Sequence, residues 1–151
     1  MVTVSANYGT SGSLAVRGSS AYLSYLRFSL PPAPAGQTLK SAVLRVMTSS
    51  DPTAGTNDTV SVVPVTGAWT ETGVAYNSRP ALSPTVLGTL GGATTISTSY
   101  TVPLDISQLT GSLGGSYALA LTSTGTDAMW LWSRQAASQA NGPRLVLTFG
   151  S

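Results

Sequence analysis

The sequence contains no cysteine and no histidine, and only 8% of its 151 residues are charged. Without these two residue types the chain cannot form a disulfide, a zinc site of cysteine or histidine ligands, or a nucleophile activated by histidine. Its five acidic residues are scattered. They do not suggest the pair of carboxylates, roughly 5–9.5 Å apart, that glycoside hydrolysis needs. The usual machinery of hydrolytic enzymes is therefore missing.

The chain also lacks any cluster of lysine or arginine, and its net charge is only +2. Proteins that bind DNA or RNA gather basic residues on one face, so this composition argues against a nucleic-acid partner. No apolar run approaches the roughly 18 residues of a membrane-spanning helix. A strand-like stretch, Val2-Thr3-Val4-Ser5, follows Met1 directly. We therefore expect neither a membrane span nor a signal peptide in this chain.

The sequence is instead rich in serine, threonine and glycine, with 22, 21 and 16 residues, so hydroxyl groups and backbone form most of its polar surface. Extracellular modules often have such a composition. We expect one domain over residues 1–151 that is a secreted module of a longer protein, and a cytosolic protein is the alternative. A domain of this length buries enough surface to fold without disulfides or metal.

Apolar and polar residues alternate in short stretches along the chain, as β-strands require. Leu26, Phe28 and Leu30 fall on one face of such a stretch, and Tyr25 and Arg27 fall on the other. The expected strands are 12–17, 22–30, 39–48, 59–66, 85–90, 98–104, 116–123, 128–134 and 143–149.

Eight to ten short strands in one domain predict an all-β fold, a two-sheet antiparallel β-sandwich of the jelly-roll type. The one helical signal is Asp105, which we expect to cap a single turn. If strands 22–30 and 39–48 pair as a hairpin, Arg27 and Arg45 lie on neighbouring outward faces.

Short motifs run in a fixed order through nearly the whole chain. They are NYGT at 7–10, LAVR at 14–17, YLRF at 25–28, LRV at 44–46, VTGAWTE at 65–71, YNSRPA at 76–81, SRQA at 133–136 and PRLVL at 143–147. In this order they resemble the DNRLRE-type domain family, which looks like the family-96 carbohydrate-binding modules. The resemblance implies a non-catalytic β-sandwich appended to a secreted polysaccharide-degrading enzyme, with alginate as one kind of ligand.

Three positions depart from that family pattern. Ser29 and Gln135 stand where aspartate and glutamate are common, and Tyr76 stands where tryptophan is common. Two acidic neighbours of arginine are thus neutral in this chain, which calls any family salt bridge at these places into question.

Trp130 and Trp132 are two residues apart, so in a strand their rings project from the same face, with Arg134 next along it. Side chains at this spacing lie about 6.5–7 Å apart and suit the stacking of pyranose rings on indole faces. Because Met129 and Leu131 are apolar as well, alternation does not decide which pair is buried. The tryptophans form either a sugar platform or part of the core.

Six of the seven basic residues are arginine, whose planar group binds carboxylates through two hydrogen bonds. This favours an acidic polysaccharide as ligand. An alternative is that the arginines brace loops, which we expect of Arg79 before Pro80, while Trp69 is expected to pack against the core or a loop. The predicted ligand-binding residues are Tyr25, Arg27, Arg45, Trp130, Trp132 and Arg134.

Two other functions stay open. In a polysaccharide lyase, Tyr25 would abstract a proton beside a uronate neutralised by Arg27. A structural spacer or adhesin module would have no glycan site at all.

We predict no catalytic residue and no cofactor. Calcium is the alternative, held in the loop that contains Asp51 and Asp58, although turn formation accounts for both residues. The expected partners are a polysaccharide and the catalytic domain of a larger secreted chain, with no nucleic acid and no membrane. The module itself is expected to be a monomer.

Overall fold

The computed structural model describes residues 7–151, and within this range the chain forms nine β-strands and four single turns of 3-10 helix. No helix in the described range is long and apolar enough to cross a membrane. The strand-like stretch 2–5 lies outside the described residues. The strands are β1 (Ser13–Val16), β2 (Ser24–Ser29), β3 (Thr38–Met47), β4 (Val60–Pro64), β5 (Gly88–Leu90), β6 (Ser99–Leu104), β7 (Ser116–Ser123), β8 (Met129–Trp132) and β9 (Arg144–Gly150).

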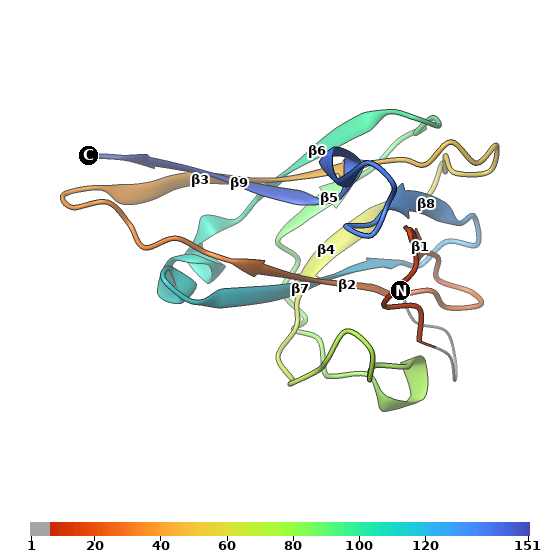
Figure 1. Ribbon diagram of the computed structural model, residues 1–151, viewed down its shortest axis with the longest axis horizontal. Coiled ribbons are helices and arrows are strands. Elements are labelled where there is room, and N and C mark those ends of the chain that lie inside the picture. Colours follow the sequence, from red (N-terminus) through yellow and green to blue (C-terminus); the bar gives the residue numbers. More distant parts are fainter. Residues whose placement is uncertain (1–6) are drawn as a thin grey trace.

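The strands form two antiparallel layers (Figure 1). One layer has the strand order β2-β7-β4-β5, and the other has the order β6-β3-β9. Strands β1 and β8 pair as a two-stranded ribbon, which a bridge between Thr48 and Leu131 joins to the end of β3. The predicted all-β antiparallel sandwich is confirmed.

Each strand expected from alternation is present, with its ends moved by a few residues. The largest change is at 85–90, where only Gly88–Leu90 is a strand. The predicted cap is confirmed, because the Asp105 carboxylate accepts a hydrogen bond of 2.9 Å from the backbone N–H of Ser107 and begins a single 3-10 turn.

The core between the layers is built from the inward faces that alternation predicts. Leu26 and Phe28 of β2 belong to the same apolar cluster as Leu44 and Val46 of β3. Burial of these side chains between the sheets is the main favourable term for folding such a domain.

A second apolar cluster lies outside the sandwich, on the outer face of β2, β7 and β4. Residues 65–82, which we call the covering segment, pack over this face. Tyr25, predicted to be exposed on the outer face of its strand, is only 6% exposed because the covering segment lies on it. Alternation assigned its face correctly, and Arg27 and Ser29 on that face are exposed, but Tyr25 itself is covered.

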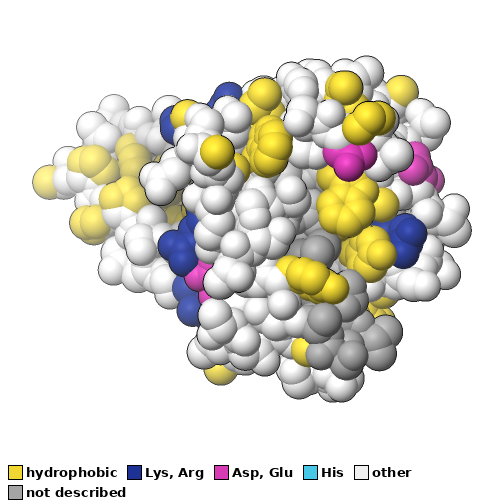
Figure 2. Space-filling model, turned by 45° about the vertical axis from the view of Figure 1, so that its right-hand side comes forward, with side chains coloured by type: hydrophobic (Ala, Val, Ile, Leu, Met, Phe, Trp, Pro, Cys, Tyr) yellow, Lys and Arg dark blue, Asp and Glu magenta, His cyan; other side chains and the backbone are white. Residues whose placement is uncertain are grey.

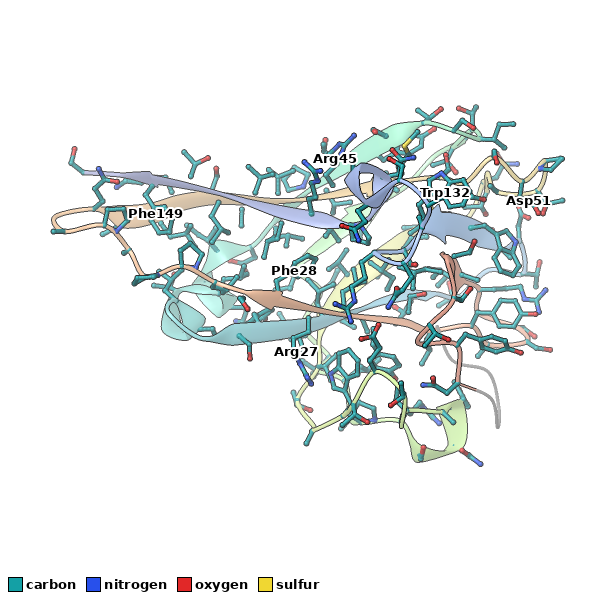
Figure 3. The ribbon with its side chains drawn as sticks, viewed as in Figure 1. Arg27, Phe28, Arg45, Asp51, Trp132 and Phe149 are labelled. Atoms are coloured by element: carbon teal, nitrogen blue, oxygen red, sulfur yellow. The ribbon has the colours of Figure 1, made fainter. Side chains whose placement is uncertain are left out.

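The hairpin considered for strands 22–30 and 39–48 does not form. Strand β2 pairs only with β7, whereas β3 pairs with β6 and β9 in the other layer. The proline-rich stretch 31–36 carries the chain from one layer to the other, so the apolar faces of β2 and β3 oppose each other across the core. Arg27 and Arg45 therefore lie on opposite outer faces of the molecule (Figure 3).

Leu44 tests the core because it is fully buried at the centre of β3. We expect Leu44→Ala to lower the free energy of unfolding by about 2–5 kcal/mol, since it removes transfer energy and leaves a cavity. Val146→Ala on the adjacent strand β9 is the matched control, because Val146 is 52% exposed and its truncation should cost less than about 0.5 kcal/mol. Urea unfolding measures both, and equal losses would contradict this description of the core.

Candidate functional site

A pocket of about 360 Å³ follows the unpaired edge of β2. Successive β2 residues from both faces of the strand, Tyr25 to Ser29, line it, so the pocket wraps around the strand edge. Its other walls come from the N-terminal segment, the covering segment and the loop between β8 and β9. The volume is at the low end of the range for small-molecule sites.

Arg27 projects from the outer face of β2 into this region, and Trp69 of the covering segment positions it. Its Nη2 donates a hydrogen bond of 2.8 Å to the backbone oxygen of Trp69, and its guanidinium lies over the Trp69 ring at 4.5 Å. Within the described residues Arg27 forms no salt bridge. An arginine has five N–H donors, so most of those of Arg27 are free to bind a ligand.

Two buried polar atoms beside Arg27 have no hydrogen-bond partner in the described part of the chain. They are the hydroxyl of Tyr25 and the indole Nε1 of Trp69, whose rings pack at 5.6 Å. Burial raises the pKa of the Tyr25 hydroxyl above its usual value. Unsatisfied polar groups lower the stability of a core. Their presence in two residues that line the pocket is more typical of a binding site than of a surface that serves only for packing.

Arg134 lies on the opposite wall, paired with Glu71 of the covering segment. The guanidinium binds the carboxylate through Nη2 and, at 3.3 Å, through Nε. The hydrogen bond from Arg134 lowers the pKa of Glu71 below its usual value, and Glu71 in turn raises the pKa of Arg134. Gln135 also donates a hydrogen bond to Glu71. A glutamate at position 135 would repel Glu71, so the neutral residue suits this site.

The N-terminal segment is fixed to the same carboxylate-bearing turn. Asn7 donates hydrogen bonds of 2.8 and 2.6 Å to the backbone oxygens of Glu71 and Val74. Gly9 packs so closely against the Glu71 backbone that any Cβ there would clash with it. These contacts place Tyr8, which is 41% exposed, at the rim of the pocket.

The six predicted ligand-binding residues lie in three places. Tyr25, Arg27 and Arg134 line the pocket. Arg45 lies on the outer face of the other layer, where it donates hydrogen bonds to Ser99 Oγ at 2.9 Å and to the backbone oxygen of Ala140 at 3.4 Å. It is remote from Arg27, as the two labels in Figure 3 show.

Trp130 and Trp132 occupy the outer face of the β1–β8 ribbon and are half-buried, while Met129 and Leu131 are each 1% exposed in the core. The structure thus shows that Met129 and Leu131 are the buried pair, a choice that alternation left open. Neither tryptophan lines the pocket. Strand β8 ends at Trp132, and the chain then turns so that Arg134 reaches Glu71 instead of continuing the tryptophan face.

Two further predictions about single residues are confirmed. Arg79 anchors its loop, because its Nη1 donates a hydrogen bond of 2.6 Å to the Tyr76 backbone oxygen and its guanidinium lies 3.8 Å from the centre of the Tyr76 ring. Trp69 packs against the second apolar cluster.

The loop considered for calcium is held by turn formation. The Asp51 carboxylate accepts a hydrogen bond of 2.7 Å from the backbone N–H of Thr53. Among the described residues no group of three or more acidic side chains is placed to hold a metal ion.

A comparison with known protein families identifies the family of the chain. The model of carbohydrate-binding module family 96 matches residues 2–149, nearly the whole chain. The chain belongs to this family. The resemblance inferred from short motifs is therefore confirmed for family 96. A search of curated proteins finds no match.

Sequence reasoning did not predict Tyr8, Trp69, Glu71 or Gln135 as site residues, although all four line the pocket of this family-96 module. All four fall inside the motifs at 7–10, 65–71 and 133–136. The motifs were the available signal, and only the fold shows that they meet at one place.

Glu71 gives a test of the pocket's electrostatics. Because its pKa is lowered in the folded state, its pairing stabilises the module fully above its ordinary pKa of 4.5 and loses this effect as the pH falls through the lower folded value. The pair is largely exposed, so we expect Glu71→Gln to cost at most about 1 kcal/mol at pH 7. The difference from the unaltered protein should shrink steadily below pH 4.5.

Thermal or urea unfolding between pH 7 and pH 3 measures this effect. Asp127→Asn, which removes an exposed carboxylate away from any salt bridge, is the control. A Glu71→Gln difference that persists unchanged at low pH would show that the carboxylate charge is not what stabilises this wall.

Proposed function

We propose that this module binds an acidic polysaccharide, a polyuronate such as alginate, in the pocket along β2, and that it targets an attached secreted enzyme to that polymer. The observation that carries the proposal is Arg27. Its guanidinium is positioned by Trp69 and has no acidic partner among the described residues. A positioned arginine with free donors matches the geometry of a carboxylate.

The charges around the pocket support an acidic ligand. The pocket lining contains two basic side chains, Arg27 and Arg134, and one carboxylate, that of Glu71. Ser29, next along the outer face of β2, is uncharged. The lining therefore carries one uncompensated positive charge, which a uronate would neutralise.

The aromatic residues supply the second element of sugar recognition. Tyr8 at the rim is exposed enough for its ring to stack on a pyranose, whose C–H groups meet the electron-rich face of the ring. Stacking orients the sugar, and Arg27 selects its charge.

A single shallow site of this kind binds weakly, in the micromolar to millimolar range. Weak binding is sufficient for targeting, because a module linked to an enzyme raises the effective concentration of that enzyme on the polymer. The proposed function is thus recruitment, with the chemistry carried out by the attached domain.

The lyase alternative finds no support at Tyr25. Its hydroxyl is buried, and burial raises its pKa, whereas a general base at neutral pH needs a lowered pKa and access to the substrate proton. Tyr25 and Arg27 are therefore better suited to binding than to elimination.

Replacement of Arg27 tests the proposal. Arg27→Gln should lower the affinity of the module for alginate about tenfold or more, because a hydrogen bond between charged groups is lost. Retardation of the module in native gels containing alginate measures this affinity. The affinity of Arg27→Lys should lie between those of Arg27→Gln and the unaltered module, since lysine keeps the charge but cannot form two parallel hydrogen bonds to a carboxylate. Arg144→Gln removes the same charge from an exposed position on β9 and should leave retardation unchanged.

Unfolding curves of the three variants show whether each still folds. The proposal fails if folded Arg27→Gln is retarded as strongly as the unaltered module. It also fails if Arg144→Gln weakens binding equally, because net charge alone would then explain the retardation.

A further inference from the structure

A second surface of aromatic rings, each half-buried, lies on the outer face of the β1–β8 ribbon, apart from the pocket. The register places Trp132 opposite Ser13 and Trp130 opposite Ala15. The alternate residues of both strands point into the core and are at most 6% exposed. By the pleat of the ribbon the two tryptophans lie on its other face, across from two small side chains, of which Ala15 is fully buried beneath the rings.

Tyr22 and Arg17 extend this surface. Tyr22 pairs with Arg17 through two backbone hydrogen bonds of 3.1 and 2.9 Å, and its ring lies 6.0 Å from that of Trp130 at an angle of 54°. The Arg17 guanidinium lies over the Tyr22 ring at 4.2 Å. A chain of contacts thus links one cation and two rings, with Trp132 beside them on the same strand face.

Packing against the core does not account for this grouping. Tyr22, Trp130 and Trp132 are each half-buried rather than enclosed, and none belongs to either apolar cluster. Figure 2 brings this end of the molecule forward and shows hydrophobic side chains gathered at the surface beside basic ones. Partly exposed aromatic groups gathered in one patch are typical of a binding surface.

We propose that Arg17, Tyr22, Trp130 and Trp132, which we call the ribbon face, form a second sugar-binding site that takes an uncharged chain of pyranose rings. Stacking on aromatic faces uses the C–H groups of the sugar and needs no charge on it. The spacing of Trp130 and Trp132, about 6.5–7 Å in a strand, allows neighbouring parts of one chain to stack on both rings.

The charge of the ribbon face is confined to its Tyr22 end, and Trp132 lies at the uncharged end. The one cation of this face is Arg17, whose Nε already donates a hydrogen bond of 3.0 Å to the backbone oxygen of Ser20. The remaining donors of Arg17 suit the hydroxyl and ring oxygens of a sugar. The two tryptophans, by contrast, have no basic partner in the described residues. Recognition at this face therefore depends on ring stacking.

The inference goes beyond the proposed function, because it uses different residues and a different ligand class. A module with both sites would hold an acidic polymer at the pocket and an uncharged polymer at the ribbon face. Where both polymers occur in one matrix, two weak contacts would act together and slow release.

The three tryptophans of the chain make the two sites separable by fluorescence. Trp69 lies at the pocket, and Trp130 and Trp132 lie on the ribbon face. In Trp69→Phe only the ribbon face reports, and in the double variant Trp130→Phe with Trp132→Phe only the pocket reports. The probes are cellohexaose, mannohexaose and xylohexaose as uncharged chains, and an alginate hexasaccharide as the acidic one.

We expect at least one uncharged hexasaccharide to change the tryptophan emission of Trp69→Phe in a saturable way and to leave that of the double variant unchanged. The alginate hexasaccharide should change the emission of the double variant and leave that of Trp69→Phe unchanged. In native gels containing the corresponding uncharged polymer, Trp132→Ala should lose at least tenfold in affinity, as expected when a stacking ring is removed, while Arg27→Gln should bind as the unaltered module does.

The second site is overturned if none of the three uncharged chains changes the emission of Trp69→Phe. It is also overturned if folded Trp132→Ala and Arg27→Gln lose alginate binding equally, since the two surfaces would then be one site. Trp132→Phe, which keeps an aromatic ring, guards against loss of folding and should retain most of the binding. If alginate binds nowhere while an uncharged chain binds the ribbon face, the proposed function fails and this inference stands.

Discussion

The site depends on one packing contact outside the sandwich, that of the covering segment on the outer face of β2, β7 and β4. Tyr25, Val63 and Val74 are buried there, and Trp69 packs against them. Residues 65–82 form only short regular elements, so this apolar contact, together with hydrogen bonds such as those from Asn7, holds them in place. Without it, neither Trp69 nor Glu71 would have a defined position at the pocket.

The same contact gives the two pocket arginines different roles. Trp69 supports Arg27 by its ring and backbone oxygen and leaves its charge uncompensated. Glu71, two residues further along the same segment, neutralises Arg134. One arginine is thus available to a ligand, and the other joins the β8–β9 loop to the covering segment. Identical side chains differ in function because of which groups the covering segment presents to them.

The fold was largely predictable from the sequence, because each strand shows its own alternation of apolar and polar residues. Leu26 and Phe28 of β2 were assigned to one face of their strand on that basis, and that face packs in the core. Pairing was not predictable in the same way. Nothing in the residues of β2 shows that its neighbour is β7 rather than β3, because an inward apolar face satisfies either arrangement.

The candidate site was less predictable for two physical reasons. Alternation tells which residues share a face and not whether another segment covers that face, so Tyr25 was placed correctly and its burial was missed. The pocket is also assembled from segments far apart in the chain. The Gln135 side chain donates hydrogen bonds to Glu71, 64 residues away, and to the backbone oxygen of Gly9, 126 residues away. Long-range contacts of this kind leave no local pattern.

The position of the pocket has a consequence for solubility. Strand β2 ends its sheet, and a bare sheet edge invites strands of other molecules to pair with it and start aggregation. Here the surrounding loops flank that edge, and Arg27 places a charge on it. The loops and the charge that form the pocket therefore also keep this edge from becoming a template for intermolecular β-sheet.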